Sequence, residues 1–344
     1  MENTFRPRSC GIWSVLNREQ LNFEDIIKEF IDNGRVAAAN QIKVHLMQTD
    51  INQFSLEVTD NGCGMDREDF DQIFSIGSLR GKLVYKRCGM GLKVALANAD
   101  PENISWEIRT KTTDGECSYI GAPYAEKMTF EPLDSKELKS LERSGTIVSS
   151  MLSRSVFERG LEGAENDEER IAMLVEILRV TYAPLLPKEQ PAEEDGHFGI
   201  QLIWTPLFGQ EKVTDLTALS PIWTQQNDGY QSANIQNDSD VYAQYTYGKI
   251  EPIPENFRFY RGDRQSAGLM VYLRGRLVQY GIFSEVWKCD NPRQNNFLFV
   301  VNWGGTVTKL PRCNLGKTQL QAEDAKVHDF LRWVQQTCPQ PFNG

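Results

Sequence analysis

The stretch from Glu29 to Lys93 constrains this 344-residue chain more than any other, because it holds three short motifs in a fixed order. The first is Glu-Phe-Ile-Asp-Asn at 29–33, the second is Asp-Asn-Gly-Cys-Gly-Met at 60–65, and the third is Gly-Met-Gly-Leu-Lys at 89–93. Each motif alone is a weak signal. Their order and spacing together predict one site, built from a helix face, a turn after a strand and a turn that opens a second helix.

The first motif lies in a predicted amphipathic helix from Phe23 to about Ala39, where apolar residues recur at helical spacing. Glu29 and Asn33 are four residues apart and therefore share one face of this helix. A carboxylate there can act as general base towards a water, and an amide oxygen one turn later can hold magnesium. A glutamate and an asparagine on a helix face are more often merely solvated, so this pair depends on the other two motifs.

The second motif follows a predicted strand from Phe54 to Thr59. Asp60 closes this strand, and Gly62 and Gly64 leave room beside it. A buried carboxylate that accepts a hydrogen bond from an exocyclic amine selects adenine, because it rejects the carbonyl of guanine. The alternative is an ordinary hairpin or Asx turn, which the same sequence favours equally.

The third motif precedes a predicted helix at 91–99 and suits a phosphate group. Gly89 and Gly91 allow close approach of the backbone, and the first amides of a helix point outward with a positive dipole. Lys93 in the first turn would add positive charge. A tight turn without a ligand remains the alternative for this motif alone, but the three motifs together predict an ATP site.

Residues 75–88, between the second and third motifs, show no convincing period. They include Ser78 and Lys82 among other small and basic residues. We therefore predict a mobile lid over the site.

A competing nucleotide motif, Gly316-Lys317-Thr318, matches the second half of a P-loop. The loop requires a glycine five residues before Gly316, and that position is Pro311. Proline lacks the amide and the conformational freedom that the loop uses. The P-loop hypothesis is therefore disfavoured.

Composition limits the class of protein. The net charge of −10 disfavours a surface that coats nucleic acid everywhere, although a local basic patch stays open. Seven scattered cysteines without a Cys-x-x-Cys pair, and only three histidines, disfavour a disulfide framework and a structural zinc. The N-terminus lacks an apolar signal region, and no later run approaches the length of a membrane span. We expect an intracellular protein with no membrane partner, nuclear in a eukaryote and cytoplasmic in a bacterium.

Periodicity predicts the remaining elements. The segment up to about Asn22 lacks a clear period, which favours an arm outside the core. Strands are predicted at 42–47, 54–59, 104–110, 116–121, 127–131, 146–151, 200–204, 241–247, 269–273, 276–280 and 297–301. Helices are predicted at 23–39, 65–74, 91–99, 135–143, 168–186 and 324–335.

The three motifs, with Phe-Ser-Ile-Gly-Ser at 74–78, resemble those of the GHKL ATPases, the superfamily of gyrase, Hsp-ninety-type chaperones, histidine kinases and MutL. They most resemble the MORC-type branch. A further family signal is Ser-Gly-Thr-Ile-Val at 144–148. The resemblance implies an α+β fold class: a Bergerat sandwich over residues 1–153, with a mixed, mostly antiparallel sheet, helices on one face, and ATP between helices and sheet.

The resemblance also implies roles by position. Glu29 would be the general base, Asn33 the magnesium ligand, and Asp60 the adenine partner. Thr146 is expected to contact the adenine pocket, partly through water. The other nucleotide contacts that it implies are Gly62, Gly64, Met65, Ser78, Lys82, Gly89, Gly91, Leu92 and Lys93. The chain departs from the family at 34–37, where Gly-Arg-Val-Ala replaces a small residue followed by an acidic one, and this removes support for one accessory polar contact.

Residues 154–344 resemble, more loosely, the transducer-type α/β domain that follows this ATPase in gyrase, MutL and MORC proteins. The support is a predicted hairpin at 271–278 and the loop at 314–318. In the family a lysine on that loop reaches the terminal phosphate, which makes Lys317 the candidate sensor and a second catalytic residue. The alternative is a solvated loop lysine.

The resemblance thus implies a MORC-like ATPase that binds Mg-ATP, forms a homodimer through its ATPase head and hydrolyses ATP slowly. DNA or chromatin is a candidate partner for such a clamp, and nucleotide-gated assembly in a defence system is another candidate task. A binding scaffold with little turnover stays open. A heat-shock-type chaperone would need further domains for which the chain has no room, and a histidine kinase lacks a phosphoacceptor histidine before Glu29.

Overall fold

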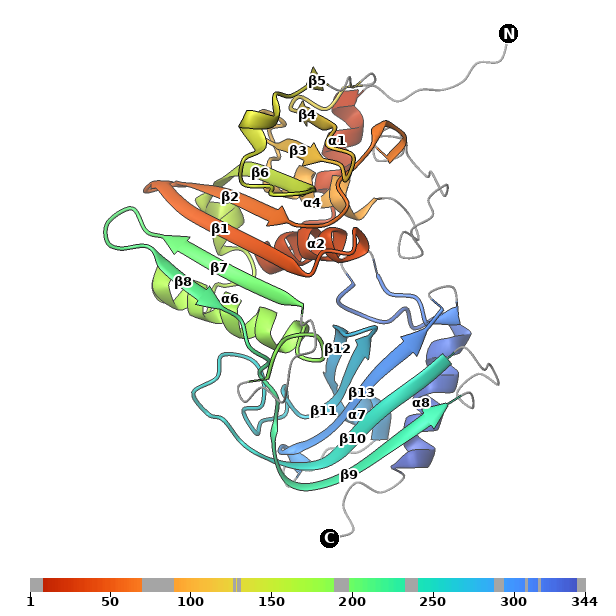
Figure 1. Cartoon of the computed structure of the whole chain (residues 1–344). Coiled ribbons are helices and arrows are strands. Elements are labelled where there is room, and N and C mark those ends of the chain that lie inside the picture. The colour runs from red at the N-terminus through yellow and green to blue at the C-terminus, as the bar shows by residue number, and fades with distance from the viewer. Residues whose placement is uncertain are drawn as a thin grey trace. The chain divides into compact units, whose positions relative to one another are not determined.

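The computed structural model describes residues 9–69, 90–125, 128, 131–188, 198–232, 241–287, 294–306, 309–314 and 317–338 (Figure 1). The chain divides into two compact units, Met1–Val175 with Glu193–Leu216, and Glu176–Ala192 with Thr217–Gly344. The domain boundary at residue 153 stays a prediction, since these units place 154–175 with the first unit. The predicted lid at 75–88 lies outside the described residues.

The first unit contains an eight-stranded sheet in the order β5-β4-β3-β6-β2-β1-β7-β8. Its strands are β1 (Gln41–Asp50), β2 (Gln53–Asp60), β3 (Glu107–Lys111), β4 (Cys117–Gly121), β5 (Glu131–Pro132), β6 (Gly145–Ser153), β7 (Gly199–Thr205) and β8 (Lys212–Asp215). Only the β1–β7 pair is parallel, and the other pairs are antiparallel. The predicted mixed, mostly antiparallel sheet is therefore confirmed.

Helices cover one face of this sheet, and they are α1 (Ser9–Asn17), α2 (Phe23–Val36), α4 (Gly91–Ala99), α5 (Arg154–Glu158) and α6 (Asp167–Thr181). Figure 1 shows α2 and α4 beside each other against the central strands. On β1 the alternate residues Ile42, Val44 and Leu46 are buried, as expected for a strand with one covered face. The predicted helix at 168–186 ends five residues early, at Thr181.

Four aromatic rings fix α2 and α5 on this sheet. The centroid of Phe157 lies 4.2 Å from Phe54, 5.3 Å from Phe23 and 6.3 Å from Trp204. Each side chain is at most 1% exposed. Such pairs contribute about 0.5–1.5 kcal/mol each beyond their buried area, so this cluster holds the first motif against the strands.

The N-terminal segment is not simply an arm, and the expectation for it was wrong from residue 9 onward. Trp13 on α1 is 3% exposed and stacks at 5.7 Å on Trp106 and at 5.6 Å on Tyr124. Its indole N–H donates to the carbonyl of Asp100 at 2.9 Å. The partners of Trp13 lie between 87 and 111 residues away in sequence, which is why local periodicity does not reveal the packing.

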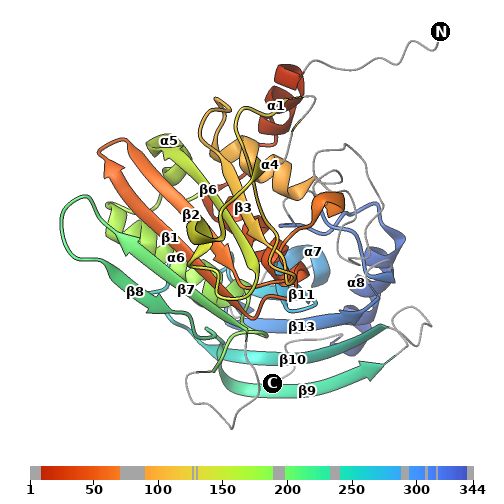
Figure 2. The same ribbon diagram turned by 45° about the horizontal axis from the view of Figure 1, so that its top comes forward.

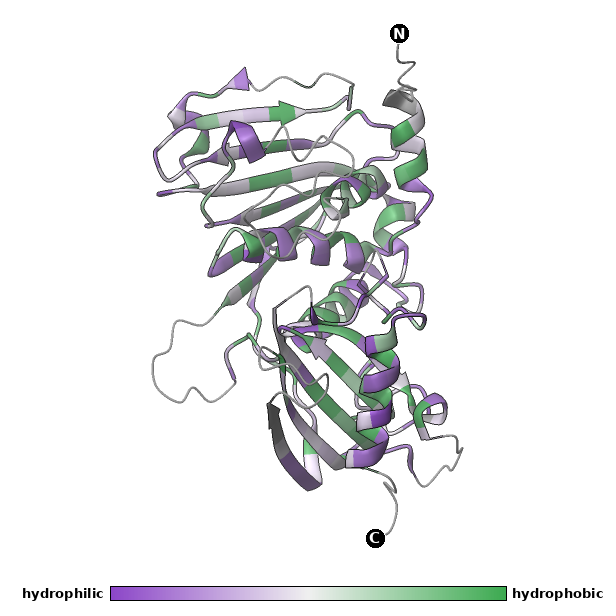
Figure 3. Cartoon of the chain, turned by 90° about the vertical axis from the view of Figure 1, so that its right-hand side faces the viewer, coloured by the Kyte–Doolittle hydropathy of each residue, from purple (hydrophilic) through white to green (hydrophobic). Residues whose placement is uncertain are grey.

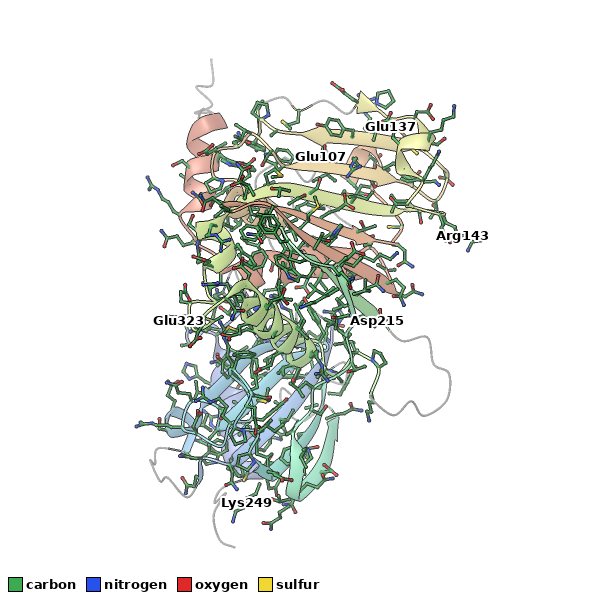
Figure 4. The ribbon with its side chains drawn as sticks, turned by 90° about the vertical axis from the view of Figure 1, so that its left-hand side faces the viewer. Glu107, Glu137, Arg143, Asp215, Lys249 and Glu323 are labelled. Carbon is green, nitrogen blue, oxygen red and sulfur yellow. The ribbon has the colours of Figure 1, made fainter. Side chains whose placement is uncertain are left out.

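The predicted helix at 135–143 is only a 3₁₀ turn, Ser135–Leu138, capped by the Asp134 side chain, which accepts from the Lys136 N–H. Leu138 and Leu141 pack with Cys117 and Ile147 into a small separate core. Ile147 alternates with the helix-facing residues of β6, so this core lies on the opposite face of the sheet. Glu107 on β3, labelled in Figure 4, belongs to that same opposite face and forms a 3.1 Å ion pair with Arg109.

The second unit contains a five-stranded sheet in the order β12-β11-β13-β10-β9. Its elements are β9 (Ile222–Ser232), β10 (Val241–Glu251), β11 (Gly268–Leu273), β12 (Arg276–Ile282), α7 (Phe283–Trp287), β13 (Phe297–Gly305) and α8 (Ala325–Thr337). The predicted β11–β12 hairpin is confirmed. Its two central residues, Arg274 and Gly275, have φ of 53° and 82°, the left-handed values of the hairpin turn that a glycine favours.

Helix α8 packs on this sheet through residues spaced three or four apart, and hydrophobic and hydrophilic residues alternate along it in Figure 3. Its buried side chains are Val327, Phe330, Trp333 and Val334. Strands β8 and β9 were not predicted, because their residues are mostly exposed and polar. None of the described helices is long and apolar enough to cross a membrane.

Candidate functional site

The first motif is buried on α2. Glu29 is 3% exposed, although it is a carboxylate on a helix. The Asn33 side-chain N–H donates to the Glu29 carbonyl at 2.7 Å. Within the described part of the chain, the Asn33 Oδ1 accepts no hydrogen bond, so this oxygen is available to a ligand.

The third motif meets the first at Gly91, which is the first residue of α4. A Cβ at Gly91 would lie 2.2 Å from Glu29 Oε2. Since real Cβ contacts are never this short, any larger residue at position 91 would displace the Glu29 carboxylate from the start of α4. The structure therefore brings together the predicted base and the predicted phosphate turn. Gly89 lies outside the described residues, as do Ser78 and Lys82.

Lys93 lies in the first turn of α4 and is 1% exposed. Leu92, beside it, is partly exposed. A lysine in so buried a place is unusual unless its ammonium is paired. The burial of Lys93 therefore favours a specific role over that of a solvated surface lysine.

Asp60 at the end of β2 is 8% exposed. Its Oδ1 accepts from the Gly62 N–H at 2.8 Å. Burial removes water from the carboxyl and raises its pKa from 3.8 to about 6, while backbone hydrogen bonds from Gly62 and Thr146 act in the opposite direction. The carboxylate is thus both ionised near neutral pH and strongly attractive to a hydrogen-bond donor.

The run from Gly34 to Ala37, which departs from the family pattern, packs against the second motif. A Cβ at Gly34 would lie 2.9 Å from the Asp60 Cβ, so α2 approaches Asp60 closely at this point. The Ala37 carbonyl accepts from the Cys63 N–H at 2.9 Å. A Cβ at Gly62 would lie 2.7 Å from this same carbonyl. Small residues here let the end of α2 pack against the turn.

Position 64 requires a glycine because its backbone packs closely against β3. Its φ is +74°, and a Cβ there would lie 2.1 Å from the Lys111 carbonyl oxygen. Met65, the next residue, donates its N–H to the Thr110 hydroxyl at 2.9 Å. The second motif is therefore tied to β3 as well as to α2.

Thr110 is a site residue that the sequence did not indicate. It is fully buried on β3, and its hydroxyl donates to the Gly145 carbonyl at 3.0 Å and lies 3.4 Å from the Thr146 hydroxyl. The Ser144 hydroxyl donates to the Gly62 carbonyl at 2.6 Å. These contacts bring Thr146 beside the second motif, because β6 pairs Thr146 directly with Asp60. A threonine within an alternating strand carries no local signal of this role.

The side-chain oxygen of Asn33 on α2 is a suitable ligand for magnesium. Asn33 offers one uncharged oxygen, and magnesium is usually held by one or two protein oxygens together with substrate phosphates and water. The described residues contain no cluster of three or more His, Cys, Asp or Glu side chains able to hold a metal ion. Asn33 stays the predicted magnesium ligand on α2.

Lys317 lies in the second unit, in a turn organised by Asn314. The Asn314 Oδ1 accepts from the backbone N–H of Thr318 at 2.8 Å and of Gln319 at 3.1 Å. Lys317 itself has a left-handed φ of 52°. The sensor role of Lys317 stays a prediction.

Comparison with known proteins supports the fold and the family of the first unit. Residues 21–119 match the model of a family described as histidine kinase-, DNA gyrase B-, and HSP90-like ATPase. A crystal structure of the N-terminal domain of a DNA repair protein shares the fold, with a TM-score of 0.56 and 14% sequence identity, over 95% of this chain and 96% of that one. A comparison with curated proteins gives no match.

The predicted fold class is confirmed: a sandwich of the Bergerat type followed by a further α/β domain. The matched region contains α2, the Asp60 turn and α4, which carry the three motifs. Residues 21–119 are thus similar to the histidine kinase-, DNA gyrase B-, and HSP90-like ATPases, and the whole chain shares its fold with the N-terminal domain of a DNA repair protein.

Proposed function

We propose that this protein is a MORC-like ATPase that binds Mg-ATP between α2, α4 and the Asp60 turn and hydrolyses it slowly. The observation that carries the proposal is the contact between Gly91 and the Glu29 carboxylate. It supports the proposal because a buried carboxylate lies at the N-terminus of a helix, where the terminal phosphate of a nucleotide would lie.

In this proposal Asp60 binds the adenine amine through its ionised carboxylate, and Thr146 lines the same pocket. Gly91 and Lys93 bind phosphate oxygens at the start of α4. Glu29 accepts a proton from a water as that water attacks the terminal phosphorus, and the bond to the bridging oxygen of ADP breaks. The products are ADP and inorganic phosphate.

Asn33 would hold magnesium through Oδ1. When bound, the ion offsets the negative charge that develops on the phosphoryl group in the transition state. Asn33 is oriented for this by its own N–H, which donates to the Glu29 carbonyl. The same hydrogen bond links the metal ligand to the residue that carries the base.

The test of the enzyme is phosphate release by the wild type and by Glu29→Ala. We expect release by the wild type and loss of it in the variant. Glu19→Ala, at an exposed glutamate, is the matched control and should behave as the wild type. Equal background rates in the wild type and Glu29→Ala would instead support a nucleotide-gated scaffold with little turnover.

We further propose that ATP favours a homodimer through the first unit, with DNA as a candidate partner of the closed dimer. ATP can shift this equilibrium only if it binds the dimer more tightly than the monomer. Light scattering on a sizing column should show an increase in particle mass on addition of a non-hydrolysable ATP analogue. DNA added afterwards should co-elute with the dimer, and unchanged elution of DNA would argue against a DNA clamp.

A further inference from the structure

Strand β9 forms an edge of the second sheet, and no described strand pairs with its outer side. It is eleven residues long and pairs with β10 alone among the described residues. Figures 1 and 2 show it at the rim of the sheet, beyond β10. The outer N–H and C=O groups of such an edge are a template for another strand.

The other three edges carry the devices by which proteins prevent strand pairing. Strand β5 has two residues and includes Pro132, and β8 has four residues with Lys212 and Asp215, the latter labelled in Figure 4. Strand β12 ends in a residue with a left-handed φ, Ile282. The Gln279 side chain on β12 accepts from the Leu320 N–H, so a later segment of the chain contacts this strand. Only β9, among the described edges, is long and without proline, lysine or arginine.

We propose that β9 is an interface for a second copy of this chain, which pairs its own β9 antiparallel to form one continuous ten-stranded sheet. This contact is separate from the nucleotide site and requires no nucleotide. Because both copies use the same edge, the association is two-fold symmetric and closes at a dimer. The blunted edges elsewhere would prevent further strand addition.

The chemistry of β9 favours its own copy as the occupant. Between Gln225 and Ser232 the strand pairs regularly with β10, after a register shift near Thr224. Half of the residues in this stretch are amides, which carry both a donor and an acceptor and therefore complement themselves. Strand β9 has one charged residue, whereas the whole chain has a net charge of −10. Two copies therefore repel each other less at β9 than their net charge suggests.

The single charge of β9 is already engaged. Asp228 accepts from the Thr246 hydroxyl at 2.7 Å and from the Gln226 amide at 2.8 Å. A two-fold axis at Gln226 would pair Gln225 with Asn227 of the second copy. It would separate the two Asp228 carboxylates by four residues along the strands, about 14 Å, so they would be largely screened at physiological salt.

A charge-swap experiment tests this pairing by sedimentation velocity without nucleotide. The wild type should sediment as a dimer. The double variant Gln225→Lys/Asn227→Lys should be monomeric, because like charges then face each other across the strands. Mixing it with Gln225→Glu/Asn227→Glu should restore a dimer that contains one chain of each variant.

The control is Thr214→Lys/Gln244→Lys, which adds the same charge at exposed positions on β8 and β10 and should stay dimeric. A monomeric wild type, a dimeric lysine variant or failure of the mixture to pair would each overturn the proposal. A monomeric wild type would leave an extended peptide of another protein as the occupant of the edge. Nucleotide-driven dimerisation through the first unit is then measured in the lysine variant, so the two proposals succeed or fail separately.

Discussion

The variant Asp60→Asn tests two roles of the buried Asp60 carboxyl separately. One is its electrostatic cost to the stability of the fold, and the other is its proposed recognition of adenine. The Asn oxygen can still accept from the Gly62 N–H, which lies 2.8 Å from Oδ1 in the wild type, so we expect the variant to fold. A rise in the pKa of Asp60 from 3.8 to about 6 corresponds to about 3 kcal/mol of unfolding free energy.

The sign follows from proton binding. Between pH 4 and 6 the folded protein keeps the proton of Asp60 that the unfolded chain has lost, so the free energy of unfolding falls as pH rises. Above pH 6 the carboxyl is ionised in both states and the full cost remains. The variant lacks this titration and should therefore be more stable than the wild type at pH 7 by up to about 3 kcal/mol, with little difference near pH 4.

Urea unfolding of both proteins between pH 4 and 7.5 measures this difference, because other titrating groups cancel on subtraction. Calorimetry with a non-hydrolysable ATP analogue measures recognition. We expect the variant to lose binding, since a charged hydrogen bond contributes about 1.5–3 kcal/mol and the amide can present a donor to the adenine amine. A stability difference independent of pH would refute the electrostatic argument, and normal nucleotide affinity in the variant would remove Asp60 from the adenine site.

Three further predictions concern the rest of the site. Gly91→Ala should lower kcat far more than it raises KM, because its Cβ would displace the Glu29 carboxylate; steady-state kinetics that match the wild type would contradict the contact. Lys317→Ala should bind the ATP analogue yet fail to form the nucleotide-dependent dimer, and undiminished dimerisation in light scattering would return this lysine to a solvated loop. Thr110→Val should lower the free energy of unfolding in urea by about 1–3 kcal/mol, because the Met65 N–H and the Gly145 carbonyl lose their partner. Thr59→Val, on the less buried side of β2, is the matched control and should have little effect.

The sequence predicted correctly those elements whose structure depends only on residues close to them in the chain. The period of apolar residues predicted α2 from Phe23, and the glycine turn before residue 91 predicted the start of α4, as the structure confirms. The β11–β12 hairpin follows from the turn at 274–275, where glycine can adopt a positive φ. Each of these elements needs only sterics and hydrophobic spacing within about a dozen residues.

The tertiary structure alone decided the features that depend on distant partners. Helix α1 is part of the core because Trp13 stacks on Trp106, and no period within α1 carries that information. The role of Thr110 arises because strands β3 and β6 and the turn that holds Met65 meet at its hydroxyl. The long open edge of β9 is likewise a property of strand order, since a polar strand is recognisable only once its neighbour in the sheet is known.

The stretch from 29 to 93 shows both kinds of information. The sequence determined its residue types, and hence the chemistry of a base, an adenine partner and a phosphate turn. Only the fold decided that Gly91 would meet Glu29 and that Gly34 would meet Asp60. The reason is that such contacts join segments whose separation in sequence exceeds the reach of any helical or strand period.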